Sequence, residues 1–435
     1  MTPKRTWRMS ATCISAFKAC PTRFRLGYVE GLRMAESTEA MRIGTNWHAC
    51  LEVARLTPGR HCLCFAESLE SLADPECPIC SGEGTVPDTD PLERVTDWLN
   101  HAYATVPESI DPVAWAVERV TLAYSVAGWL WYYGERGETV ATEIPFDLPL
   151  RNPATGRALP HVRRVGKIDR LERVDGRVLN GEYKSTSSAI DSGSPYWDRL
   201  NIDSQISTYA SAVRELQASG ALEAYDIGPD DPVISGTLYN VWHKPGIRPK
   251  KLTQGETKKF IEPGDDCGKY FGEEFEAKVG PDDPDHPELG VMVLVDGEPA
   301  EVFPGAIPKE TKKNPNPATP FAIRETPDMF GARLLKSIYE EPEKHFAERE
   351  IARTDDELRD FDWQMYHMYQ SMRAMNKAEH WWLNEHQCDA MGTFRCPYTS
   401  ICHNRQLENV CDGKTTPPGF RRIFNDVETP VTEEV

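Results

Sequence analysis

One hairpin pattern between residues 165 and 185 constrains the fold of this chain more than any other feature. Asp175-Gly176 is a strong signal for a two-residue turn, and β-forming residues run on both sides of it. Counted outward from that turn, Asp169 lies directly opposite Glu182. Cross-strand neighbours have Cβ atoms about 5 Å apart, and two like charges at that distance are destabilising unless a cation lies between them. The pattern therefore predicts a divalent cation bound between two strands.

Lys184 adds a third charged group to this pair. It follows Glu182 by two residues, so the pleat places both side chains on one face of the strand. The carbonyl of Tyr183 stays available as a further oxygen ligand. A metal ion polarises a phosphoryl oxygen, and an ammonium beside it orients the nucleophile or stabilises the developing charge. We therefore predict phosphodiester hydrolysis; the alternative is an ordinary amphipathic hairpin with surface charges.

Two helical patterns flank the hairpin in the sequence. His48 and Glu52 are four residues apart in one expected helix, and Gln205 and Tyr209 are four apart in another. Taken in order, G-x-x-x-H-x-x-x-E, G-x-x-D, E-x-K and Q-x-x-x-Y resemble the motifs of the RecB-like branch of the PD-(D/E)XK nucleases. The resemblance implies an α/β fold of the restriction-endonuclease-like type with an αβββαβ core.

The resemblance also implies roles for several residues of these motifs. The expected ligands of Mg²⁺ or Mn²⁺ are His48, Asp169, Glu182 and the main-chain carbonyl of Tyr183. Lys184 would serve the attacking water, whereas Gln205 and Tyr209 would hold DNA near the site. Ile168 replaces the proline of the family's name, a departure that is common in this branch and leaves the carboxylate in place.

The formal net charge of −19 argues against unspecific binding of nucleic acid by the whole surface. The charge is unevenly distributed, because residues 1–33 contain seven Lys and Arg against one Glu. Residues 151–184, which include the hairpin, contain nine Lys and Arg against four acidic residues. We expect these two basic segments to attract a DNA backbone locally, although such stretches are more often only solvated faces.

A C-x-C pair and a C-x-x-C pair lie in a segment rich in Cys, Gly, Pro and Asp. The four residues are Cys62, Cys64, Cys77 and Cys80. Four cysteines within nineteen residues suit tetrahedral Zn²⁺. The second pair resembles the C-x-x-C-x-G-x-G knuckle of chaperone zinc fingers. We predict a structural zinc site; free surface thiols, or His61 as one of the ligands, are the alternatives.

A second group of cysteines joins distant parts of the sequence. It consists of Cys20 and of the trio Cys388, Cys396 and Cys402. The arrangement resembles the iron–sulfur site of the helicase–nuclease subunit AddB and of CRISPR-associated exonucleases, which implies that the four thiolates hold a [4Fe-4S] cluster. Seven residues separate the first two members of the trio, where the family often has two, so Cys411 or Cys13 could substitute. A zinc site in which Cys411 joins the trio is a further alternative.

The motifs divide the sequence into six expected segments. They are a helical N-terminal part of the core with the first cluster cysteine (1–56, helical from residue 10), a zinc-binding insertion (57–95), the nuclease core (96–245), a second insertion (246–320), a C-terminal helical region with the iron–sulfur cysteines (321–417) and an acidic tail (418–435). The expected architecture is thus an α/β core with a zinc-binding insertion and an iron-sulfur-stapled helical periphery.

These patterns favour a metal-dependent DNA nuclease. By resemblance we expect an exonuclease on single-stranded DNA or DNA ends, in recombination, repair or phage DNA metabolism. A non-catalytic DNA-binding or assembly module and an RNA-processing nuclease are the alternatives. The sequence has no Walker A pattern, so a helicase or recombination protein would be a separate partner. No apolar stretch is long enough for a membrane span or signal peptide, so we expect a cytoplasmic protein with reduced thiols.

Overall fold

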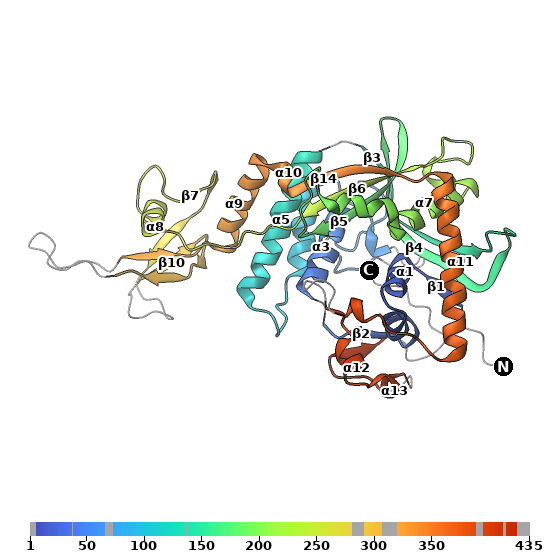
Figure 1. Cartoon of the computed structure of the whole chain (residues 1–435). Coiled ribbons are helices and arrows are strands. Elements are labelled where there is room, and N and C mark those ends of the chain that lie inside the picture. The colour runs from blue at the N-terminus through green and yellow to red at the C-terminus, as the bar shows by residue number, and fades with distance from the viewer. Residues whose placement is uncertain are drawn as a thin grey trace, which may run out of the picture.

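A six-stranded mixed sheet lies at the centre of the computed structural model, which describes residues 6–36, 38–65, 73–134, 137–280, 291–306, 320–388, 395–411 and 415–423 (Figure 1). Its strands are β1 (Trp7–Met9), β3 (Glu138–Arg151), β4 (Ala158–Val174), β5 (Arg177–Thr186), β6 (Gly236–His243) and β14 (Phe346–Ala352). The pairs β1–β4 and β5–β6 are parallel. The pairs β3–β4, β4–β5 and β6–β14 are antiparallel.

Helices pack on this sheet in two groups. The first group consists of α3 (Glu39–Ala54), α4 (Pro91–Ala102), α5 (Pro112–Tyr133) and α9 (Pro327–Glu340). It shares an apolar core with the sheet, in which Trp47 of α3 stacks on Trp242 of β6 with ring centroids 4.3 Å apart. The second group consists of α1 (Ala11–Ala19), α7 (Ser204–Ala218) and α11 (Asp355–Ala378). The order α3, β3, β4, β5, α7, β6 along the chain confirms the predicted αβββαβ core.

The β4–β5 hairpin has the register that the Asp175-Gly176 turn predicts. Both turn residues have positive φ, and the ladder from this turn ends at the pair Arg170–Gly181. Because β3 covers the other edge of β4, β1 shares with β5 the edge that faces away from β3, and its ladder ends at Arg164. Between these two ladders, the described residues provide no partner strand for this edge of β4. Asp169 lies in this interval.

Distant parts of the chain meet beside the second helix group. Strand β2 (Leu32–Met34) pairs with β15 (Phe420–Arg422), and the hydroxyl of Thr22 donates to the carbonyl of Trp382 (2.9 Å). The expectation that residues 10–56 are continuously helical is wrong, because Gly31 adopts a φ of 68° and β2 follows it.

The remaining α-helices of the described chain are short. They are α2 (Pro21–Phe24), α6 (Pro195–Asp198), α10 (Pro342–His345), α12 (Thr399–His403) and α13 (Leu407–Val410).

The predicted acidic tail falls mostly outside the described residues, which end at residue 423. Among the described helices, none combines the length and the apolar character that crossing a membrane requires.

Residues 246–325 form a small unit that extends from one end of the molecule (Figure 1). Its elements are α8 (Gln254–Ile261), β7 (Lys269–Tyr270), β8 (Glu273–Glu274), β9 (Ala277–Gly280), β10 (Met292–Val295), β11 (Glu298–Pro299), β12 (Val302–Pro304) and β13 (Phe321–Ile323). Phe260 and Val293 belong to its own apolar core, which Met329 of α9 completes. An Asp296-Gly297 turn joins β10 to β11, and both residues have positive φ.

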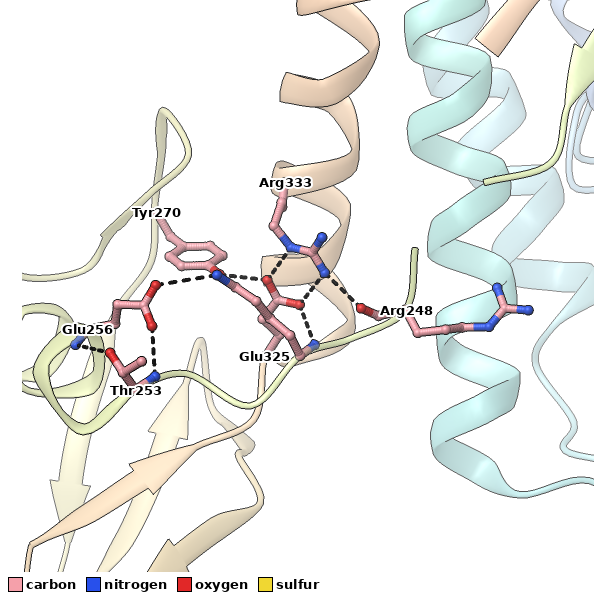
Figure 2. A network of polar contacts seen from close by, with 7 residues as sticks. Arg248, Thr253, Glu256, Tyr270, Glu325 and Arg333 are labelled. Carbon is pink, nitrogen blue, oxygen red and sulfur yellow. Dashed lines mark hydrogen bonds and ion pairs between the residues drawn. The ribbon is translucent and has the colours of Figure 1, made fainter. Parts of the chain in front are cut away.

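Glu325 connects this unit to α9 (Figure 2). Its side chain is 0% exposed. The carboxylate accepts hydrogen bonds from the Tyr270 hydroxyl (2.6 Å), from Nε and Nη2 of Arg333 (2.6 and 2.8 Å) and from the main-chain nitrogen of Lys250 (2.7 Å). A buried carboxylate with this many donors holds the unit and the helix in one relative position.

We expect Glu325→Ala to lower the free energy of unfolding by about 3 kcal/mol, because it leaves the Arg333 guanidinium without its carboxylate partner and the Tyr270 hydroxyl without its acceptor. The matched control is Glu301→Ala, which removes only an exposed ion pair with Arg324 (2.6 Å). That variant should lose less than about 1 kcal/mol. Urea denaturation measures both, and equal losses would contradict the prediction.

Candidate active site

Asp169 and Glu182 lie where the ladder between β4 and β5 ends. Oδ2 of Asp169 accepts a hydrogen bond from the main-chain nitrogen of Tyr183 (3.1 Å). A carboxylate thus satisfies a strand nitrogen at the point where the β4–β5 ladder has ended. The strands stay close enough for the two carboxylates to interact, and they leave an edge of β4 without a partner strand in the described chain.

Glu182 is the most deeply buried member of the group, with 1% of its surface exposed. Its Oε1 accepts a hydrogen bond from Nε2 of Gln205 (2.8 Å) and forms an ion pair with Nζ of Lys184. Burial, followed by the charge of Asp169, raises the pKa of Glu182 to about 8. Burial opposes the charge of Lys184, but the attraction of Glu182 and Asp169 outweighs it and raises the pKa of Lys184. The lysine is therefore an ammonium.

Helix α3 brings His48 to the same place. Its Nδ1 lies 3.6 Å from Oδ2 of Asp169, and its ring meets the Tyr183 ring edge-on with centroids 6.2 Å apart. Burial lowers the pKa of His48, more strongly than the attraction of Asp169 raises it. The imidazole is therefore neutral near pH 7, which is the form that binds a metal ion.

These groups fit a divalent cation. Within the described chain, Oε2 of Glu182 is buried and has no hydrogen-bond partner. An unsatisfied buried acceptor is costly, and a cation is the partner that a carboxylate oxygen lacks. One imidazole nitrogen together with carboxylate oxygens is a donor set that suits Mn²⁺ or Mg²⁺.

Three further titratable side chains surround the group, and the motifs assign none of them a role. Glu143 of β3 forms an ion pair with Lys167 of β4. Glu52 lies one turn after His48 on α3, and burial, followed by the charge of Glu143, raises the pKa of Glu52 to about 7. Lys167 stands two residues before Asp169, so the period of a strand could have placed it on the same face.

The two predicted DNA contacts on α7 differ in their surroundings. Gln205 holds Glu182, as described above, and is partly exposed. Tyr209 is 9% exposed, and its ring packs edge-on against Phe146 with centroids 5.9 Å apart. A DNA-binding role for these two residues stays a prediction.

The C-x-C and C-x-x-C pairs converge on one point. The sulfur atoms of all four cysteines lie within 4.8 Å of one another, and Cys62 and Cys77 are 3.6 Å apart. No other group of three or more Cys, His, Asp and Glu in the described ranges is as compact. Although burial acts in the opposite direction, the main chain of Gly84 and Gly82 lowers the pKa of Cys80, which favours its thiolate.

The second cysteine group gathers beside α1. The main-chain nitrogen of Asn384 donates to Sγ of Cys20 (3.4 Å), which brings the two distant parts of the chain into contact. The cysteines that act on the Cys402 thiol are Cys396, Cys20, Cys388 and Cys411, and together with burial, the largest cause, they raise its pKa to about 12. Cys411 also interacts with Glu30. The predicted cluster residues are thus neighbours.

The sheet, with a histidine, two carboxylates and a lysine at its parted strands, defines a restriction-endonuclease-like nuclease fold. Residues 8–403 match the family model of the PD-(D/E)XK nuclease superfamily, and the chain belongs to this superfamily. Proteins of this superfamily are typically phosphodiester-hydrolysing nucleases that use divalent metal ions. A search of curated proteins finds no relative of the chain.

The raised pKa of Glu182 predicts that metal binding depends on pH. A cation binds the carboxylate and not the protonated acid, so Mn²⁺ binding should release a proton and strengthen as the pH rises to about 8. Calorimetry in two buffers of different ionisation enthalpy measures the released proton. Glu182→Gln is the matched control, because it keeps the size of the side chain and cannot release a proton. Binding that releases no proton would contradict the prediction.

Proposed function

We propose that this chain is a metal-dependent deoxyribonuclease of the RecB-like branch, which removes nucleotides from single-stranded DNA or from DNA ends. The observation that supports catalysis best is the buried Oε2 of Glu182, which lacks a hydrogen-bond partner in the described chain and lies near Asp169. A non-catalytic module would keep this costly arrangement without using it.

Each group of the site has a part in the proposed hydrolysis. His48, Asp169, Glu182 and the carbonyl of Tyr183 would hold Mg²⁺ or Mn²⁺. The bound ion supplies a Lewis acid for the phosphodiester and lowers the pKa of a water molecule. Lys184 is held by Glu182, and its ammonium would orient the attacking water or stabilise the charge that develops on the phosphate.

The substrate preference rests on the RecB-like motifs. They favour single-stranded DNA or DNA ends over a defined internal sequence, and recombination, repair or phage DNA metabolism over restriction. Gln205 and Tyr209 would contact the DNA beside the site. Because the sequence has no Walker A motif, a helicase or recombination protein would act as a separate partner.

The two cysteine groups would bind different metals. The compact group around Cys62 suits a single Zn²⁺, because all four sulfur atoms lie within 4.8 Å of one another. The group around Cys402 is less compact, as a [4Fe-4S] cluster requires because it is larger than one ion. Its proposed ligands are Cys20, Cys388, Cys396 and Cys402. We expect both sites to be structural.

We expect Asp169→Asn to lower the rate of DNA cleavage at least about 100-fold, because the variant removes one metal-binding charge while an amide oxygen can still accept from Tyr183. The control is Asp147→Asn, which affects an exposed carboxylate that pairs with Arg8 and Arg163 on the protein surface. End-labelled single- and double-stranded DNA with Mg²⁺ or Mn²⁺ is the assay, with RNA in parallel. Equal activity of the two variants would contradict the proposed site, and cleavage of RNA alone would favour the RNA-processing alternative.

We expect cysteine variants to separate the two metal sites. Cys402→Ala should lose the visible absorption of an anaerobically purified protein and should retain zinc, whereas Cys77→Ser should lose zinc and retain the colour. Cys267→Ser is the control, because this cysteine belongs to neither group. Optical spectra and metal analysis give the result, and a colourless wild-type protein with zinc in both sites would exclude the iron–sulfur cluster.

A further inference from the structure

Lys18, in the last turn of α1, lies next to α7, the helix whose Gln205 donates a hydrogen bond to the catalytic carboxylate of Glu182. Its Nζ donates hydrogen bonds to the hydroxyl of Ser204 and to Oε1 of Gln364 on α11 (3.4 Å for the latter). Ser204 is the first residue of α7, and Gln205, which follows it, binds Glu182. Adjacent residues of α7 therefore contact Lys18 and the catalytic carboxylate.

The charge of Lys18 is not neutralised by a close carboxylate. Both of its hydrogen-bond acceptors are neutral, and no ion pair within 4.0 Å is recorded for it in the described part of the chain. Asp203 attracts it electrostatically, but the Asp203 carboxylate already accepts hydrogen bonds from the main-chain nitrogens of Gln205 and Ile206 as the N-cap of α7. The side chain of Lys18 is exposed, so a ligand can reach its ammonium.

The surroundings of Lys18 suit a nucleic acid strand. The chain is strongly acidic overall, yet residues 1–33 are basic, and other cations of this segment are already paired, such as Arg8 with Asp147. Ile202, two residues before Ser204, is 85% exposed and adds an exposed apolar side chain to the segment that leads into α7. An exposed ammonium suits a backbone phosphate, and an exposed apolar side chain suits a sugar or base.

We propose that Lys18 binds a backbone phosphate of the DNA strand that enters the active site, next to the phosphate to be hydrolysed. This inference rests on the proposed DNA nuclease and adds a substrate-binding residue that lies outside the metal-binding motifs. Lys18 would take part in binding and not in the chemical step. Its loss should therefore raise KM and leave kcat within about twofold.

The test compares Lys18→Gln, which keeps a hydrogen-bonding side chain but loses the charge, with Lys18→Arg, which keeps the charge. Binding of a labelled single-stranded oligothymidylate is measured in an Asp169→Asn background, so that the strand is not cleaved. Lys18→Gln should weaken binding about fivefold or more and reduce the slope of log K against log salt by about 0.7, the value for one phosphate contact on a single strand. Lys18→Arg should restore both. Lys336→Ala, which removes a lysine paired with Glu340 on α9, is the control for net charge.

The outcomes separate this inference from the proposed function. The inference is wrong if Lys18→Gln binds with the affinity and salt slope of Lys336→Ala. It is also wrong if the Asp169→Asn protein does not bind the strand. In either case Lys18 only links α1 to α7. If the wild-type protein binds but does not cleave DNA, while Lys18→Gln still shows the binding defect, the nuclease proposal fails and the phosphate contact stands.

Discussion

The burial of the Glu182 carboxylate beside Asp169 is the interaction on which the rest of the structure depends. Removing a charge from water costs several kcal/mol, and a second like charge nearby increases that cost. The chain meets the cost with three donors, two from β5 and one from α7. Lys184 comes from the same strand, Gln205 comes from α7, and the nitrogen of Tyr183 binds Asp169. Helix α7 and strand β5 thus hold the two carboxylates of Asp169 and Glu182 from several sides.

The opposite face of β4 and β5 must be rigid if these donors are to keep the two carboxylates in place. There Arg170 pairs with Glu172 (2.8 Å), and its guanidinium lies over the Tyr183 ring at 4.1 Å. Only glycine fits at position 181, because the Arg170 side chain crosses it and a Cβ there would clash with Nε of Arg170. The G-E-Y-K sequence therefore serves both faces. Glu182 and Lys184 form the site, and Gly181 and Tyr183 let Arg170 support it from behind.

Local signals in the sequence predict the core well. The Asp175-Gly176 turn determines the register of the hairpin, as the sequence predicts. Helix α5 is not predicted, because its residues are apolar around most of its circumference and so show no stripe of helical period. The Glu143–Lys167 pair and Lys18 are missed for another reason. The first contact joins side chains on two neighbouring strands, and the second joins Lys18 to Ser204, far away in the sequence. Residue spacing along the sequence predicts neither contact.

The two cysteine groups lie where the chain forms little regular secondary structure, although apolar side chains are buried around both of them. The segment from residue 57 to residue 90 has three residues in 3₁₀ helix and no α-helix or paired strand of its own beyond one isolated bridge, His61–Thr85, within its described part. The ends of the chain meet through one short strand pair, β2–β15, and through single hydrogen bonds such as that from Asn384 to Cys20. Segments with so little secondary structure need another source of stability, which metal–thiolate bonds provide. Because Lys18 precedes Cys20 by two residues, a cluster that holds Cys20 would also hold the end of α1 against α7. The same bonds would then position a DNA-binding side chain at the active site.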